Sequence, residues 1–315
     1  MTDTAPRALV TGGAGFIGSH LVDRLVADGH GVCVVDDLST GSASHVPPGA
    51  RFQRVDICDL ASLRDVVVGC RPEVVFHAAA QTDVRRSIRE PDFDARVNVL
   101  GGLNVLRAGV AAGVRRIVYA SSAAVYGDPE RLPVSEADPP RPISEYGASK
   151  LAFEHYLGAY AARGLIECAV LRYANVYGPG QRADGEAGVV AIFTRRMLAG
   201  EPVTIFGDGT KTRDYVYVGD VVEATIRAAA GPSGVVANVG WGREVSDLEL
   251  FRAVAAATGY TNGPSHTADR RGDIARVCLD AAVARQTWDW HASVPLEDGV
   301  RRVVQDARAR LELAR

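Results

Sequence analysis

The sequence predicts an α/β fold: a Rossmann-type doubly wound parallel sheet with a smaller C-terminal substrate-binding lobe. Two observations predict it. Short runs rich in β-branched residues alternate with helical patterns through the first half of the chain, and such alternation is typical of parallel sheets. The runs are also nearly continuously apolar, as strands buried on both faces are.

The expected elements follow that alternation. Helices are expected at 18–29 and 97–113, and glycines at positions 29 and 113 stand where this residue often ends a helix. Six strands are expected between the helices, at residues 7–11, 31–35, 51–56, 73–78, 115–120 and 167–173.

Beyond residue 174 the pattern changes. A Gly/Pro-rich loop precedes a helical pattern over 189–200, and short strands are expected at 203–207 and 213–218. We therefore expect a first domain over residues 1–173, its sheet completed by segments near 214–240. The remaining residues, mainly 174–315, are expected to form the second lobe.

Composition narrows the range of functions. The 315 residues are 47% hydrophobic and carry a net charge of −3, so neither nucleic acid nor an anionic membrane is an expected partner. No apolar run approaches the roughly 18 residues of a membrane helix, and no signal peptide is expected, so we expect a cytoplasmic protein. The five cysteines are scattered, which predicts buried thiols, with no disulfide framework and no metal site.

The segment "LVTGGAGFIGSHLVDRL" joins a strand, a glycine turn and a helix start. Its glycines fit G-x-x-G-x-x-G at positions 12, 15 and 18, and G-x-G-x-x-G at 13, 15 and 18. Glycines allow a tight turn and close approach of the backbone to a pyrophosphate, which the N–H groups of the helix start then bind. The first domain is therefore predicted to bind a dinucleotide.

The second strand ends in "VVDDLSTG", which places Asp36 18 residues after Gly18. A carboxylate near this spacing accepts hydrogen bonds from a ribose 2′-hydroxyl and repels a 2′-phosphate, so the predicted cofactor is NAD rather than NADP. Small residues after the fourth strand would let the cofactor cross the sheet edge, whereas His77 is expected to be a core residue.

The segment "SEYGASK" places Tyr146 and Lys150 four residues apart on one helical face. Ten tyrosines and two lysines in 315 residues give only about 0.06 chance matches to this pair. An ammonium beside a phenol favours the phenolate and should lower the tyrosine pKa toward neutrality. Such a tyrosine can take a proton from an alcohol. Ser122 is expected at the carboxyl end of the fifth strand, where open α/β sheets bind ligands.

These segments carry a resemblance. "TGGAGFIGSH", "DDLSTG", "HAAAQ", "ASSAAVYGD", "EYGASK", "LRYANVYGP" and "RDYVYV" together resemble the extended short-chain dehydrogenase/reductase superfamily, and within it the UDP-glucose 4-epimerases, over nearly the whole chain. The resemblance implies that Tyr146 takes the proton of the sugar 4-hydroxyl, that Lys150 lowers its pKa and holds the nicotinamide ribose, and that Ser122 bonds the 4-oxygen. Hydride would leave C4 for NAD and return to the other face of a 4-keto sugar.

The resemblance and the motifs together give a candidate cofactor site. Tyr146 and Lys150 belong to it, and its other members are Gly12, Gly15, Phe16, Ile17, Gly18, Asp36, Asp37, Leu38, Ser39, Thr40, Gly41, Asp56, Ile57, Ala78, Ala79, Ala80, Gln81, Asn98 and Tyr173.

A UDP-sugar is the implied substrate. Arginines suit diphosphate through bidentate, permanently charged donation, and an asparagine and a helix N-terminus are expected beside them. The candidate substrate residues are Thr82, Ser122, Tyr146, Asn175, Arg182, Val189, Val190, Thr204, Phe206, Arg213, Arg270 and Asp273. Members of this family are commonly homodimers, which implies a dimer through helices near 91–112 and 146–163.

The identity of the sugar stays open at this point. Arg182 stands where relatives acting on UDP-glucuronate tend to carry an arginine, which could bind the C6 carboxylate. Ala123 and Ala124 cannot donate the side-chain hydrogen bonds that a buried carboxylate needs. UDP-glucose is therefore the expected substrate, UDP-glucuronate the alternative, and an N-acetylhexosamine, with Val277 gating pocket size, a third.

The sequence leaves room for two other functions. The scaffold allows a net NAD-linked dehydrogenase or reductase of nucleotide sugars, or an NAD-binding regulator without catalysis. Dehydratases of the superfamily carry Asp-Glu after the catalytic hydroxyl residue, where this chain has Ala123 and Ala124. The complete set of Ser122, Tyr146 and Lys150 disfavours a regulator.

Overall fold

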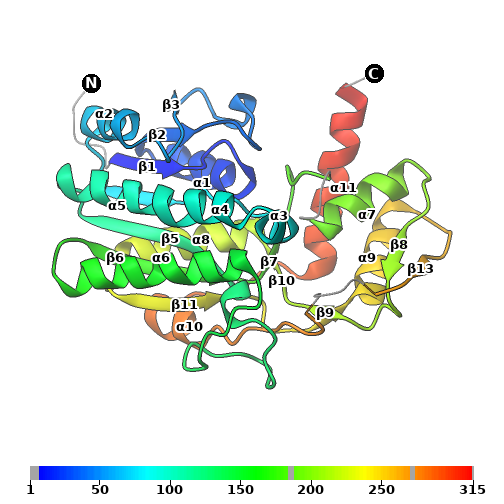
Figure 1. The fold of residues 1–315 in the computed structure, drawn as a ribbon. Coiled ribbons are helices and arrows are strands. Elements are labelled where there is room, and N and C mark those ends of the chain that lie inside the picture. The colour runs from blue at the N-terminus through cyan, green and yellow to red at the C-terminus, as the bar shows by residue number, and fades with distance from the viewer. Residues whose placement is uncertain (1–6, 184–187, 270–273, 314–315) are drawn as a thin grey trace.

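A seven-stranded parallel sheet forms the body of the molecule in the computed structural model, which describes residues 7–183, 188–269 and 274–313 (Figure 1). The strand order is β11-β6-β5-β4-β1-β2-β3, so the direction of winding reverses between β1 and β4. This confirms the doubly wound fold. The strands are β1 (Arg7–Thr11), β2 (Gly31–Asp36), β3 (Ala50–Arg54), β4 (Val74–His77), β5 (Arg116–Ser122), β6 (Glu167–Tyr173) and β11 (Val235–Val239).

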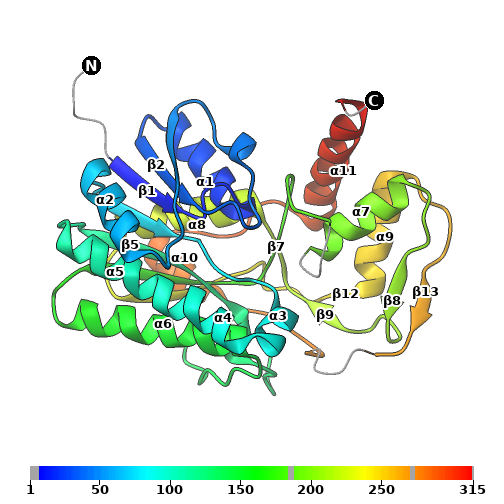
Figure 2. The same ribbon diagram turned by 45° about the horizontal axis from the view of Figure 1, so that its top comes forward.

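Helices cover both faces of the sheet (Figures 1 and 2). On one face lie α2 (Leu60–Cys70), α5 (Gly102–Ala111) and α6 (Glu145–Ala162); on the other lie α1 (Phe16–Ala27), α8 (Val218–Ala230) and α10 (Ala282–Trp288). Each face of the sheet has its own hydrophobic core, because successive side chains of a strand point to opposite faces. On β1, Leu9 packs with the first set of helices, while Ala8 and Val10 pack with the second. Gly29 and Gly113 follow α1 and α5 with positive φ angles of 84° and 74°, as expected of helix ends.

The helix expected at 97–113 has an irregular start. Short helices α3 (Val84–Arg89) and α4 (Pro91–Ala95) lead into a π-helical segment, η2 (Arg96–Gly101), before α5 begins. A π-helical turn is rare and often lies at a functional site. Two 3-10 turns complete this half, η1 (Ala43–His45) and η3 (Ala123–Tyr126).

The second lobe has its own core. It contains α7 (Val189–Leu198), β8 (Thr204–Phe206), α9 (Asp247–Thr258), β13 (Ser265–Thr267) and α11 (Leu296–Leu313), with β8 and β13 paired in parallel. Val203, Ile205, Leu250 and Val300 are fully buried in this core. Figure 2 shows the lobe beyond the carboxyl ends of the main strands.

Two small sheets connect the lobes: β7 (Asn175–Tyr177) with β10 (Tyr215–Tyr217), and β9 (Thr212–Arg213) with β12 (Val245–Ser246). The single strand expected at 213–218 is therefore divided at Asp214. Its fully buried carboxylate accepts N–H groups of Trp241, Gly242 and Leu279 at 2.8–3.1 Å, which turns the backbone between the two sheets.

The cysteine prediction was wrong at one pair. Cys33 on β2 and Cys70 at the end of α2 form a disulfide, with their Cα atoms 6.5 Å apart. The two residues are 37 positions apart in sequence, and only the packing of α2 on the sheet brings them together. Cys58, Cys168 and Cys278 are thiols. Within the described ranges, no helix is long and apolar enough to span a membrane.

Candidate active site

The glycine turn lies at the carboxyl end of β1, beside the switch in strand order. Gly12 has a φ of 71°, and a Cβ there would stand 2.6 Å from the backbone nitrogen of Ala79. A Cβ on Gly18 would collide with the carbonyl of Gly12. The turn is therefore packed tightly against the segment after β4, and α1 begins at Phe16 with its N–H groups at the open edge of the sheet.

Asp36 ends β2 directly beside this turn. Its carboxylate is 8% exposed and accepts N–H groups of Ala14 at 3.0 Å and Leu38 at 2.8 Å. Burial raises its pKa, against these two backbone hydrogen bonds. A fixed carboxylate at this position fits a ribose diol and repels a phosphate. The residues present therefore fit NAD.

The rest of the predicted cofactor wall forms the same edge. Asp37 accepts N–H and O–H bonds from Ser39, Leu38 has a φ of 64°, and a Cβ on Gly41 would stand 2.6 Å from the Ala14 carbonyl oxygen. Asp56 accepts the Cys58 N–H at 2.8 Å and Ile57 is buried against η2.

The segment after β4 is fixed by Thr11. The Ala78 N–H donates to the Thr11 carbonyl at 3.1 Å, and the Ala79 N–H to its hydroxyl at 3.3 Å. Nδ1 of His77 lies 2.7 Å from the same hydroxyl. Burial, followed by the charge of Lys150, lowers the pKa of His77 to about 3. His77 is therefore a neutral core residue, as expected.

Ser122, Tyr146 and Lys150 meet at the carboxyl end of β5. Ser122 is the last residue of that strand and pairs in register with Tyr173 of β6. The side chain of Ser122 faces the Tyr146 phenol and acts to lower its pKa. Lys150 is 3% exposed, and its Nζ lies 6.0 Å from the centre of the Tyr146 ring and 4.7 Å from that of Tyr119. A hydroxyl, a phenol and an amine therefore lie together at one edge of the sheet.

The pKa values differ from the expectation for the tyrosine. Burial raises the pKa of Tyr146 to about 12, although the side chain of Ser122 acts to lower it. Burial also lowers the pKa of Lys150 to about 8, against the charges of Asp94 and Glu154. In the protein alone, burial is therefore the largest influence on Tyr146, because a phenolate taken out of water is disfavoured.

Asn98 and Gln81 form a buried amide pair behind these residues. The Gln81 N–H donates to Asn98 Oδ1 at 2.8 Å, and Asn98 Nδ2 donates to the Gln81 carbonyl at 3.0 Å and to Ser149 Oγ at 3.0 Å. Asn98 lies within the π-helical segment. The pair ties the segment after β4 to α6 next to Lys150.

Tyr173 is buried, and its hydroxyl lies 2.7 Å from Thr225 Oγ1 on α8. The Tyr173 hydroxyl therefore bonds on the side of the sheet away from α6.

The candidate substrate residues of the second lobe are spread over several elements. Asn175 is exposed at the start of β7, and Arg213 donates to the Thr212 carbonyl at 2.8 Å. Val189 and Val190 begin α7 after Gly188, while Thr204 and Phe206 lie on β8. Arg270 and Asp273 lie outside the described residues, and Thr82 is exposed after β4.

Arg182 points toward the cofactor half. Its Nη1 donates to the carbonyl of Thr40 at 2.8 Å, and the side chain is exposed. The preceding loop is held by neighbouring elements: His20 Nε2 lies 2.8 Å from the Pro179 carbonyl, and the Gly180 N–H donates to Asp306 at 3.2 Å. This loop therefore bridges α1, α11 and the loop after β2.

A buried ion pair supports the site, and sequence reasoning missed it. Arg172 on β6 binds Glu154 on α6 at 2.6 Å; both side chains are at most 7% exposed. Glu154 also accepts the hydroxyl of Ser121, and Arg172 donates to Tyr126 at 2.9 Å. Glu154 is four residues beyond Lys150, so helical periodicity could have placed it on the same face of α6 as Lys150. No pattern in the sequence indicates that Arg172 on β6 is its partner.

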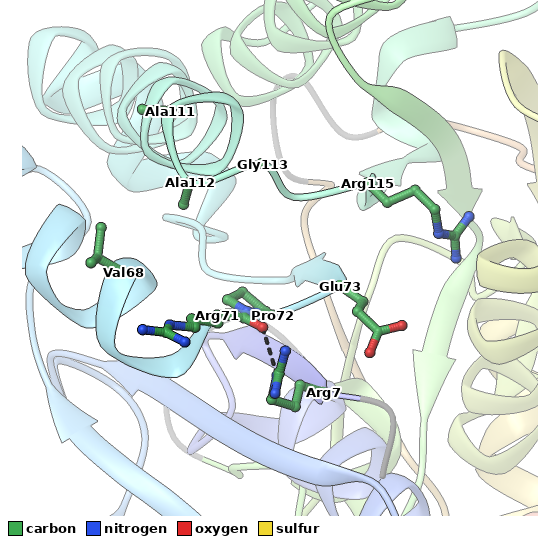
Figure 3. A pocket seen from close by; sticks show the side chains of 9 residues that line it. All are labelled: Arg7, Val68, Arg71, Pro72, Glu73, Ala111, Ala112, Gly113 and Arg115. Carbon is green, nitrogen blue, oxygen red and sulfur yellow. Dashed lines mark hydrogen bonds between the residues drawn. The ribbon is translucent and has the colours of Figure 1, made fainter. Parts of the chain in front are cut away.

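A separate hollow lies at the opposite edge, where the main strands begin (Figure 3). Arg7 there donates to the carbonyl of Arg71, at the end of α2, at 2.8 Å. Arginines at this edge satisfy carbonyls at helix ends, and the hollow is remote from the Ser122 edge. No cluster of metal-ligating side chains occurs within the described part of the chain.

The sheet, the glycine turn and the serine, tyrosine and lysine define an enzyme of the extended short-chain dehydrogenase/reductase type. The family model described as "NAD dependent epimerase/dehydratase family" matches residues 8–240, and the chain belongs to this family. Its cofactor is NAD, and it is an isomerase of the epimerase type.

Named relatives cover 95–97% of this chain. A UDP-glucose 4-epimerase of Mycolicibacterium smegmatis is 47% identical over 95% of this chain and 97% of its own. The structure of UDP-glucose 4-epimerase with UDP-glucose from Thermotoga maritima has a TM-score of 0.95 and 44% identity, covering 97% of this chain and 99% of that one. The NAD complex of the Thermus thermophilus UDP-glucose 4-epimerase has a TM-score of 0.91 and 44% identity, covering 96% and 99%.

Proposed function

We propose that the protein is a UDP-glucose 4-epimerase, which interconverts UDP-glucose and UDP-galactose through a transient 4-keto sugar. One observation carries the proposal: Ser122, Tyr146 and Lys150 gather at the sheet edge that also bears the glycine turn and Asp36. The relatives named above carry this activity in their names, at 44–47% identity.

Each residue has a chemical task. Tyr146 takes the proton of the sugar 4-hydroxyl, Ser122 hydrogen-bonds the same oxygen, and Lys150 favours the phenolate form of Tyr146. When bound, NAD would supply the hydride acceptor for the oxidation at C4 and the hydride donor for the reduction of the opposite face. Tyr146 then returns the proton. Asp36 and the turn around Gly12 would hold the adenosine ribose and the pyrophosphate.

We assign the nucleotide end of the substrate to the second lobe, and the cofactor to residues 1–173 with β11. Arg213, Asn175 and the start of α7 would bind the diphosphate, with Arg270 as a second arginine and Asp273 as the ribose ligand. Thr204 and Phe206 on β8 would lie beside the uracil. Long arginine side chains near exposed backbone suit a diphosphate.

A neutral sugar fits better than a uronate. The guanidinium of Arg182 bonds the carbonyl of Thr40, within the cofactor half, and Ala123 and Ala124 after Ser122 have no polar side chains. A C6 carboxylate would need polar partners, which Ala123 and Ala124 do not supply, and Arg182 is directed at Thr40. A net dehydrogenase of nucleotide sugars is the remaining rival, and it would release reduced cofactor.

We also propose a homodimer in the cytoplasm. Four large apolar side chains are 40–58% exposed on neighbouring helical segments: Val84 and Ile88 on α3, Leu100 on η2 and Tyr156 on α6. Such a patch is typical of an interface between copies. Light scattering should give twice the chain mass, and Leu100→Glu with Tyr156→Glu should give monomers. A monomeric unmodified chain would refute the dimer.

The test of the activity uses UDP-glucose as the only added sugar. Chromatography should reveal UDP-galactose. The NADH measured by absorbance at 340 nm should stay far below one equivalent per molecule of UDP-galactose formed. Steady accumulation of NADH would instead identify a dehydrogenase. UDP-glucuronate and UDP-N-acetylglucosamine, run beside it, test the two other sugars.

A further inference from the structure

Asp94, at the end of α4, is a buried carboxylate without a task in the proposed reaction. Its side chain is 1% exposed. The same oxygen, Oδ1, accepts Gln81 Nε2 at 2.8 Å and Asn98 Nδ2 at 3.1 Å. Both donors are neutral amides. A carboxylate taken out of water among neutral groups is costly, and it is retained where its charge has a use.

The amides connect Asp94 to the catalytic helix. Asn98 also donates to Ser149, the residue before Lys150, at 3.0 Å. The π-helical segment begins two residues after Asp94. It contains Asn98, about one helical turn beyond Asp94, and Asn98 there contacts both Asp94 and Ser149. The charge of Asp94 is thus fixed beside α6 at the level of Lys150.

The other ionisable groups around Lys150 are paired or uncharged. Glu154, one turn further along α6, is paired with Arg172 at 2.6 Å, which offsets its field at the lysine. His77 on β4 is held neutral by burial, its pKa lowered to about 3. Tyr119 on β5 presents its ring to the lysine, 4.7 Å from Nζ to the ring centre.

Two arginines contact α4 through the ring of Phe93. Arg86 on α3 and Arg96 on η2 lie over the ring of Phe93, at 3.9 and 5.2 Å from its centre, and Arg86 binds Glu90. Burial lowers the pKa of Lys150, and of its two carboxylate neighbours Asp94 opposes this more than Glu154 does. Asp94 also raises the pKa of Tyr146, after the larger effect of burial.

We propose that Asp94 is a positioning residue of the reaction: its buried charge keeps Lys150 protonated beside Tyr146 and thereby sets the pH range of catalysis. The role of Asp94 in catalysis rests on the proposed epimerase function. The electrostatic coupling between Asp94 and Lys150 can be measured without substrate.

Asp94→Asn isolates the charge, because an amide oxygen can still accept both hydrogen bonds that Oδ1 accepts now. Asp92→Asn is the matched control, since Asp92 lies on the same helix but is exposed. Removing a negative charge lowers the pKa of every neighbouring group. In Asp94→Asn both limbs of the kcat/KM profile for UDP-glucose should therefore move to lower pH, by about one unit, and Asp92→Asn should leave them in place.

Lysine labelling supplies the independent measurement. The chain has only two lysines, Lys150 and Lys211, so selective ¹³C labelling at Cε gives two NMR signals, and Lys211→Arg assigns them. The titration midpoint of Lys150 should fall by about one unit in Asp94→Asn while that of Lys211 stays unchanged. A Lys150 midpoint that does not move overturns the proposal, whatever the activity.

Asp94→Ser provides a second, smaller substitution if the asparagine variant does not fold, and it predicts the same Lys150 shift. Absence of epimerase activity in the unmodified protein, with the Lys150 shift present, would refute the proposed function and leave the coupling standing. Unmoved pH limbs with a reduced kcat would assign Asp94 a structural role only, against the proposal.

Discussion

Two regions of the molecule are built in different ways: the candidate catalytic edge of the sheet, with Ser122, Tyr146 and Lys150, and the second lobe. At the catalytic edge, Asp36, Asn98 and Lys150 are at most 8% exposed, and the amide and carboxylate groups are held by backbone or buried partners. In the second lobe, Asn175 is exposed and Arg213 donates to its own neighbouring backbone. The first region is ordered by the fold, whereas the second offers long side chains to a ligand. Substitutions should therefore affect turnover and stability in the first region and substrate affinity in the second.

The largest effect should come from Tyr146→Phe. Loss of the phenolic base should lower kcat by about 10³-fold, within the usual range for a positioned acid/base group. Because Asp36 and the glycine turn are unchanged, NAD content measured after gel filtration should stay the same. A variant that keeps a tenth of its activity would remove Tyr146 from the base role.

The buried ion pair should affect stability. Arg172→Met leaves Glu154 buried without its partner and should cost about 3–5 kcal/mol in urea unfolding. The matched control is Arg24→Met, which breaks an exposed pair with Glu223 at 3.1 Å and should cost at most about 1 kcal/mol. Equal losses in the two variants would contradict the buried role.

Arg213 tests the second region. Arg213→Ala should raise KM for UDP-glucose by about 10-fold or more, since a charge-assisted hydrogen bond contributes roughly 1.5–3 kcal/mol, while kcat and NAD content change little. Arg195→Ala on α7 serves as a control for loss of positive charge alone. A fall in kcat with KM unchanged would place Arg213 outside the diphosphate site.

Arg182 should give the smallest effect on UDP-glucose. Its exposed bond to Thr40 is worth about 1 kcal/mol at most, so Arg182→Ala should change KM and kcat by less than about fivefold. Arg196→Ala is a close control, because half-buried Arg196 also donates to a backbone carbonyl, that of Pro202, at 3.0 Å. A selective collapse of activity toward UDP-glucuronate would revive the uronate alternative.

The sequence predicts the features that depend on residues close together in the chain. The doubly wound sheet follows from short-range patterns, because apolar strands and glycine turns are local signals. The position of Ser122 at the end of β5 likewise follows from where a strand stops. Tyr146 and Lys150 lie one helical turn apart, so their proximity is also local.

Long-range partners were not predictable. Glu154 and Arg172 are 18 residues apart on different elements, and Cys33 and Cys70 are 37 apart. Asp94 could not be predicted, since an aspartate in "PDFDARVN" is typical of a solvated helical residue, whereas the folded chain leaves it 1% exposed. The predicted lowering of the Tyr146 pKa also failed in the protein alone, because burial could not be weighed from spacing.

The central claim is that hydride leaves C4 of the sugar and returns to the same carbon from the other side. UDP-glucose deuterated at C4 tests it directly when the UDP-galactose formed in ordinary water is examined by mass spectrometry and proton NMR. Retention of deuterium at C4 of the product is the predicted result. Replacement of the label by solvent hydrogen would contradict the account, since it would mean that the C4 hydrogen leaves as a proton.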